Sequence, residues 1–164
     1  ASVMQYYEEQ LAQMIVLALF LPLMISSGGN SGSQASTLVI QAMATGEVKV
    51  RDWWRVFRRE VVSGLSLGII LGIIGFCRIY IWHLIFPNLY GEHWIMVGST
   101  VSLALIGIVL WGSLIGSMLP FILRRLGADP ATSSAPFVAT IVDVTGLMIY
   151  LTIASWIFGP LMNG

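Results

Sequence analysis

The sequence predicts an all-α integral membrane protein, a polytopic helical bundle, because its few charged residues lie between long apolar runs. Of the 164 residues, 57% are hydrophobic and 10% are charged, whereas a soluble domain has about 25% charged residues. No Asp, Glu, Lys or Arg occurs in the segments 10–46, 93–123, 130–142 and 144–164. Apolar runs of about 18 residues or more can cross a bilayer as helices. These runs are too continuous for membrane barrel strands.

Four complete spans are expected, at residues 11–45, 61–86, 94–123 and 131–158. Lys and Arg concentrate in the cytoplasmic connections of membrane proteins. Here they fill the first and third connections, 46–60 and 124–130, and are absent from the second. We therefore expect those two connections to be cytoplasmic and the carboxyl terminus to lie outside.

The first span contains a polar segment, residues 26–34, that reads Ser-Ser-Gly-Gly-Asn-Ser-Gly-Ser-Gln. A helix over all of 11–45 would be about 50 Å long, which exceeds the hydrocarbon thickness. We therefore expect the helix to be interrupted here, with polar groups facing water, protein or an ion. A kink with close helix packing is the alternative. The candidate pore residues in this segment are Gly28, Gly29, Asn30 and Gln34.

Small residues recur at four-residue spacing in the second and third spans. They are Gly64, Gly68 and Gly72 in the second span, and the pairs Gly112/Gly116 and Ser113/Ser117 in the third. Such faces let helix backbones approach closely in lipid. They predict helix packing and not a ligand site.

The segment before the second span is rich in aromatic and basic residues. Trp53, Trp54 and Phe57 alternate with four arginines between residues 51 and 59. This composition is typical of a helix start at the membrane interface. A basic docking surface for a cytosolic domain is the alternative interpretation.

Asp143 is the most informative residue of the last span. With Asp129 as N-cap and Pro130 in the first helical position, it would lie about 20 Å into the helix, near the bilayer middle. A charged Asp there costs about 2.5–3.5 kcal/mol on insertion scales, so it normally faces a cavity, an ion or a partner. A structural Asp that is protonated or paired with Arg78 is the alternative.

Small residues accompany Asp143 along one expected helix face. This face contains Thr132, Ala135 with Pro136, Ala139, Asp143 and Gly146. Pro136 has no N–H, which would free the carbonyl of Thr132 as an oxygen ligand. A cation pathway explains the small residues and the carboxylate together.

Enzymatic function is not indicated by the sequence. It has no H-E-x-x-H pattern and no second intramembrane Asp for an aspartyl dyad, and the phosphate-loop pattern is also absent. Two other functions remain open at this point. The chain could be a proton- or Na⁺-coupled transporter of an organic solute with Asp143 as coupling site, or a helical scaffold.

Two segments carry a resemblance to a known family. Residues 22–38, PLMISSGGNSGSQASTL, and 123–150, LRRLGADPATSSAPFVATIVDVTGLMIY, resemble the signature segments of the MgtE family of magnesium channels. The resemblance implies a homodimer with five transmembrane helices per subunit and one pore on the two-fold axis. Residues 1–9 would then be the tail of the first helix, and this sequence lacks the cytosolic sensor and CBS domains of the family.

The resemblance also implies roles for particular residues. Asp143 would bind hydrated Mg²⁺ and Ala139 would contribute its backbone carbonyl. Ala135 stands where relatives often have Asn, so the contacts of that pore level differ here. The Gly28-Gly29-Asn30 segment would contribute to pore and gate.

Overall fold

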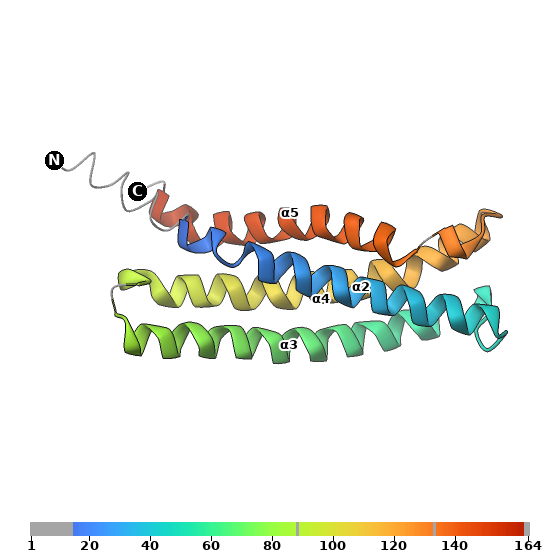
Figure 1. Ribbon diagram of the computed structural model, residues 1–164, viewed down its shortest axis with the longest axis horizontal. Helices are drawn as coiled ribbons and strands as arrows, with labels where there is room; N and C mark the ends of the chain where they lie inside the picture. The colour runs from blue at the N-terminus through green and yellow to red at the C-terminus, as the bar shows by residue number, and fades with distance from the viewer. Residues whose placement is uncertain (1–14, 88, 133, 163–164) are drawn as a thin grey trace.

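The computed structural model describes residues 15–87, 89–132 and 134–162, and every long element in these ranges is a helix (Figure 1). The long helices are α2 (Leu21–Ala44), α3 (Trp53–Ile85), α4 (Trp94–Arg125) and α5 (Ala135–Met162). Short 3-10 helices precede three of them: η1 (Val50–Asp52), η2 (Gly91–His93) and η3 (Pro130–Thr132). Within the described ranges, 4 helices are long and apolar enough to cross a membrane, which confirms the expected fold class. The expected helix tail at residues 1–9 lies outside the described residues.

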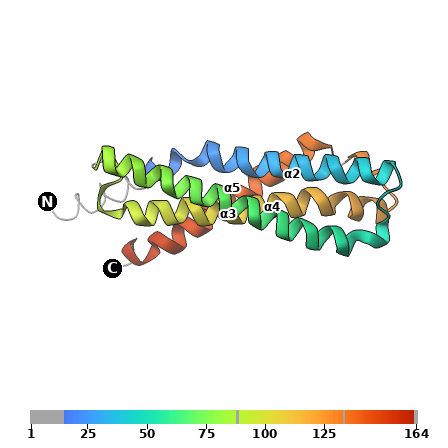
Figure 2. The same cartoon turned by 90° about the horizontal axis from the view of Figure 1, so that it is seen from below.

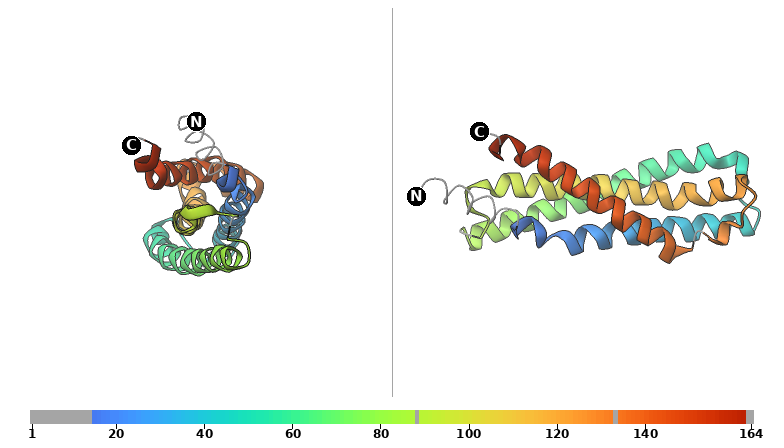
Figure 3. Two further views of the ribbon diagram at one scale, coloured as in Figure 1. Left: turned by 90° about the vertical axis from the view of Figure 1, so that its left-hand side faces the viewer. Right: turned by 90° about the horizontal axis from the view of Figure 1, so that it is seen from above.

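The four long helices run roughly along the long axis of the molecule, and α4 contacts each of the other three. Seen end on, α3 and α5 lie on opposite sides of α4 (Figure 3). Seen from below, α3 crosses α4 at a shallow angle (Figure 2). One side of the bundle is therefore formed by α3, and the opposite side by α5 with α2 beside it.

The small residues of α3 and α4 make the close contacts that their spacing predicts. A Cβ added at Gly68 would lie 2.9 Å from the Cα of Ile106, and one at Gly64 would lie 3.2 Å from the Cα of Leu110. On the other side of α4, a Cβ at Gly116 would collide with the backbone of Gly32 in α2. Glycine is thus used on two sides of α4 to bring helix backbones together.

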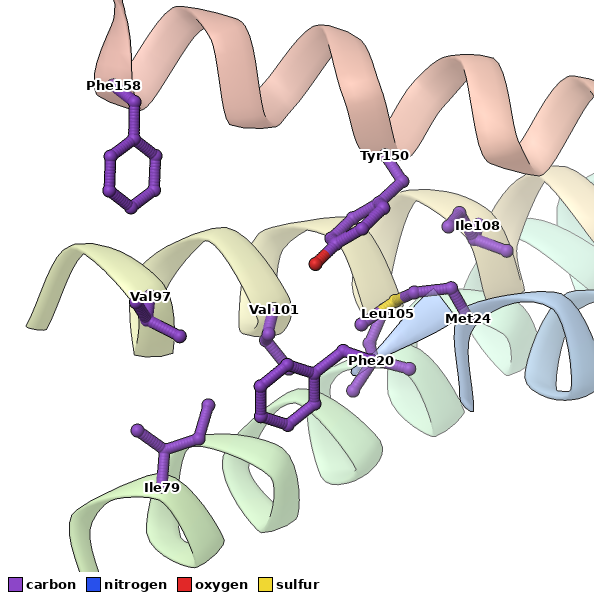
Figure 4. Close-up of a cluster of buried hydrophobic side chains, with 10 residues drawn as sticks. Phe20, Met24, Ile79, Val97, Val101, Leu105, Ile108, Tyr150 and Phe158 are labelled. Carbon is purple, nitrogen blue, oxygen red and sulfur yellow. The ribbon is translucent and has the colours of Figure 1, made fainter. Parts of the chain in front are cut away.

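A cluster of buried apolar side chains joins all four helices at one end of the bundle (Figure 4). Its members include Phe20, Met24, Ile79, Val101, Leu105, Ile108, Tyr150 and Phe158. The hydroxyl of Tyr150 donates a hydrogen bond to the carbonyl oxygen of Leu17 at 2.7 Å. The start of α2 is therefore held to α5 by both apolar packing and a polar contact.

The expected interruption at residues 26–34 is not seen, because α2 continues through this segment. Instead, the helical run from Ile15 is interrupted by a turn at residues 19–20, immediately before α2. Pro22 occupies the first turn of α2, where its missing N–H costs no helical hydrogen bond. From Leu21 to Ala44, α2 is about 36 Å long, which suits a membrane span without a further break.

The last helix also begins later than expected. Pro130 lies in η3, and α5 begins at Ala135. Asp129 still acts as a cap, since its Oδ1 accepts a hydrogen bond from the N–H of Ala131 at 2.9 Å, but it caps the 3-10 turn. Pro136 falls in the first turn of α5, where helical N–H groups have no partner in any case. Thr132 is therefore separate from the α5 face on which it was expected.

Candidate cation site

The carboxylate of Asp143 lies directly against the backbone of α2 at Gly29. A Cβ added at Gly29 would be 2.7 Å from Oδ1 of Asp143 and 3.7 Å from the Cβ of Ala139. Asp143 is half-buried and lies about 12 Å along α5 from Ala135, not the 20 Å expected from a start at Pro130. The absence of a side chain at Gly29 is what leaves room for the carboxylate.

No partner for the carboxylate is found in the described part of the chain. Asp143 forms no hydrogen bond or ion pair with the residues described. Arg78, the intramembrane cation considered as a partner, is exposed on α3, which lies across α4 from α5. In the same ranges, no group of three or more His, Cys, Asp and Glu side chains could hold a metal ion. Asp143 therefore supplies one carboxylate with free oxygens beside α2.

A row of exposed polar residues runs along α2 and includes Asn30, which follows Gly29 in the chain. We call it the α2 polar stripe; it consists of Ser26, Asn30, Gln34, Thr37 and Gln41. These residues follow three- and four-residue spacing, which puts them on one helix face. The Nδ2 of Asn30 donates to the Oγ of Ser26 at 3.2 Å. The sequence interpretation missed Thr37 and Gln41. Their spacing, three residues from Gln34 to Thr37 and four from Thr37 to Gln41, would have indicated them if residues 26–34 had been expected to be helical.

Two hydrogen bonds fix α5 on either side of Asp143. The Oγ of Ser33 donates to the carbonyl oxygen of Ala135 at 3.0 Å, which joins α2 to the start of α5. The Nε1 of Trp111 donates to the Oγ1 of Thr145 at 2.8 Å, which joins α4 to the turn after Asp143. These contacts hold the segment that carries Asp143 at a fixed distance from α2 and α4.

The remaining predicted site residues fall into two groups. Gly28 and Gly146 are buried in the bundle, where both lie against the side chain of Ile108. Pro136 and Thr132 are exposed, near the start of α5. Besides Gly29, the predicted site residue that the structure brings to the carboxylate is Ala139, one turn earlier on the same helix.

A half-buried carboxylate in an apolar helix, next to a helix with an exposed polar face, marks a candidate functional site. The family model described as MgtE, divalent cation transporter, matches residues 21–153. The chain belongs to this family. Membership confirms the resemblance drawn from residues 22–38 and 123–150, and with it the exclusion of an enzyme.

Several curated relatives are similar over nearly the whole chain. The magnesium transporter MgtE of Thermus thermophilus is 42% identical over 154 residues, which cover 94% of this chain and 32% of that protein. The magnesium transporters MgtE of Enterococcus faecalis and Bacillus subtilis are each 29% identical, with the same coverage of 94% and 32%. This family member therefore spans about a third of the length of the relatives it matches.

Proposed function

We propose that two copies of this chain form a Mg²⁺-selective channel or transporter, with Asp143 of each copy at the ion pathway. The observation that carries the proposal is the contact of the Asp143 carboxylate with α2 at Gly29, which is followed in the chain by Asn30 of the exposed α2 polar stripe. The relatives named as magnesium transporters support Mg²⁺ as the transported ion.

The exposed side of α2 and α5 supports a second copy as the partner. Polar side chains within membrane spans normally face a protein interior or a water-filled cavity, because lipid cannot hydrogen-bond to them. The α2 polar stripe is exposed on a single chain, and so are the neighbouring apolar residues Phe137, Val144 and Met148 of α5. A two-fold dimer through this side would cover the apolar residues and enclose the polar ones around a shared pathway.

Hydrated Mg²⁺ suits such a pathway. Mg²⁺ holds its water tightly and is bound through one or two carboxylates while it retains several waters. Two copies would supply two Asp143 carboxylates, which accept charge-assisted hydrogen bonds from the hydration shell. The backbone carbonyl of Ala139, one turn earlier, would accept a further bond from the same shell. Gly29 leaves room for the carboxylate beside α2.

The α2 polar stripe, with Ala135 and Pro136 at the start of α5, would line the pathway at other levels. We further propose that connections 46–60 and 124–130 face the cytoplasm. Cytosolic Mg²⁺-sensing domains of the kind found in the family would then regulate the pore from that side.

The test is Mg²⁺ flux into vesicles that contain the Asp143→Asn protein. Asparagine keeps the size of the side chain but removes one charge from each copy, and hydrogen bonds to charged groups are about twice as strong as neutral ones. We expect the Mg²⁺ flux to fall by about 100-fold, since two charged contacts of about 1.5 kcal/mol each are lost. Asp143→Glu should give an intermediate flux, because it restores the charge but moves the oxygens.

The matched control is Glu47→Gln, which removes an exposed carboxylate from the connection after α2. It should leave the flux unchanged. Cobalt(III) hexaammine, which has the size of hydrated Mg²⁺ and cannot release its ligands, should block the wild-type protein. Normal Mg²⁺ flux through a folded, dimeric Asp143→Asn protein would refute the proposal.

A further inference from the structure

A basic surface lies at the beginning of α3, away from Asp143 and the α2 polar stripe. Its side chains are Arg55, Arg58 and Arg59, all exposed. Arg58 and Arg59 follow Arg55 by three and four residues, so the three side chains share one side of the helix. The proposed ion pathway does not use them, because it lies at α2 and α5, across α4 from α3 (Figure 3).

The arginine side of α3 continues directly into an exposed apolar side of the same helix. Val62 is 66% exposed, Ile69 44% and Ile73 57%. Steps of three or four residues lead from Arg58 to Val62 and on to Ile73, so these residues lie along the same strip of the helix. The opposite strip contains Gly64, Gly68 and Gly72, which are buried against α4. Arg59 is only about 4.5 Å along the helix from Val62.

The aromatic residues beside the arginines mark the level of the membrane surface. The rings of Trp53 and Trp54 form an edge-on pair with centroids 5.4 Å apart, and Trp54 stacks on Phe57 at 5.3 Å. Trp53 and Trp54 remain 46% and 53% exposed. Exposed tryptophans gather where the hydrocarbon meets the headgroups, because the indole is both apolar and a hydrogen-bond donor. The arginines therefore lie at headgroup level.

We propose that this end of α3 binds the phosphate headgroup of an anionic phospholipid whose acyl chains lie along Val62, Ile69 and Ile73. Guanidinium groups recognise phosphate with paired N–H donors. The negative surface potential of anionic lipid attracts basic residues at the interface. Continuity between the basic strip and the lipid-facing apolar strip favours a lipid over a soluble protein domain, which would contact the arginines alone.

The test measures lipid binding to the purified chain by native mass spectrometry, with equal amounts of phosphatidylglycerol and phosphatidylcholine. We expect the wild-type protein to prefer phosphatidylglycerol by about tenfold, as expected for several basic residues near a phosphate. In the triple variant Arg55→Gln/Arg58→Gln/Arg59→Gln, this preference should disappear while phosphatidylcholine binding is unchanged. Inorganic phosphate should not displace the lipid, because it has no acyl chains to contact α3.

The matched control is Arg124→Gln/Arg125→Gln, which removes the exposed basic pair at the end of α4. It should keep the preference for phosphatidylglycerol. An equal loss in this control would mean that net charge alone attracts the lipid, and would overturn the assignment to α3. Displacement by inorganic phosphate, or an unchanged preference in the triple variant, would overturn it as well. These measurements do not depend on Mg²⁺ flux, so they stand or fall separately from the proposed function.

Discussion

The α3–α4 and α2–α5 contacts both use glycine, but for different purposes. Between α3 and α4, Gly68 faces the backbone of Ile106, and a Cβ there would lie 2.9 Å from its Cα. Between α2 and α5, Gly29 faces the end of a side chain, the Oδ1 of Asp143, at 2.7 Å from such a Cβ. In the first case glycine brings two rigid backbones together. In the second it makes room for a side chain that can rotate, so the same residue type brings backbones together in one contact and, under the proposed function, accommodates the ion-binding carboxylate in the other.

Of the substitutions that compare these two contacts, Gly68→Ala is expected to have the largest effect on folding. The new methyl group would meet the Cα and carbonyl of Ile106, which cannot rotate away. Forcing extra volume into a tightly packed contact costs about 1–3 kcal/mol, so the thermal unfolding temperature in detergent should fall clearly. Mg²⁺ flux per folded dimer should change little, because α3 lies across α4 from Asp143.

Gly107→Ala is the matched control for this prediction. A Cβ at Gly107 would lie 3.5 Å from the Cγ2 of Ile149, an ordinary contact distance. This variant should be as stable as the wild type, since alanine is a better helix former than glycine. Equal unfolding temperatures for the two alanine variants would show that the α3–α4 contact is looser than its geometry indicates.

Gly29→Ala is expected to lower stability less than Gly68→Ala but to reduce the Mg²⁺ flux clearly. The new methyl group would occupy the space of the Asp143 carboxylate, which can respond by rotating at low cost. Rotation moves the oxygens away from α2, so we expect the Mg²⁺ flux to fall about tenfold, which corresponds to about 1.4 kcal/mol. The measurement is flux per folded dimer, with the unfolding temperature recorded on the same sample. A large loss of stability with unchanged flux would contradict this prediction, because Gly29 would then act as Gly68 does, as a packing residue.

The sequence predicted the α3–α4 contact better than the α2–α5 contact, and the reason is physical. Glycines at four-residue spacing, such as Gly64 and Gly68, form a continuous groove on any helix, so their role follows from local geometry. Asp143 was singled out by a local argument, because a charge in an apolar helix requires a special environment, and its ion contact stays a prediction. Gly29 was named as a candidate pore residue, but its contact with the Asp143 carboxylate could not be predicted, since that contact depends on which helix α5 packs against.

The course of α2 shows the same limit. Residues 26–34 contain many residues of low helix propensity, and they were expected to interrupt the helix. The structure keeps them helical, because Gly28 and Gly32 pack against Gly112 and Gly116 of α4. Tertiary packing therefore outweighs local propensity here. Because the helix was expected to be interrupted at residues 26–34, the sequence interpretation did not extend the α2 polar stripe to Thr37 and Gln41.

The smallest of these effects is expected from Ser33→Ala, which tests whether α2 positions α5. Ser33 bonds to the carbonyl of Ala135 across the α2–α5 contact at 3.0 Å, whereas Ser66 bonds to the carbonyl of Val62 within α3 at 2.7 Å. A net hydrogen bond contributes about 0.5–1.5 kcal/mol. Ser33→Ala should therefore lower stability slightly and reduce Mg²⁺ flux a few-fold, because the start of the helix that carries Asp143 loses its attachment to α2. Ser66→Ala removes an equivalent hydroxyl, but it breaks no contact between helices and should leave flux unchanged. If both variants conduct like the wild type, the Ser33 bond does not position Asp143. The Gly29 contact would then be the one α2–α5 contact of the two considered that affects Mg²⁺ flux.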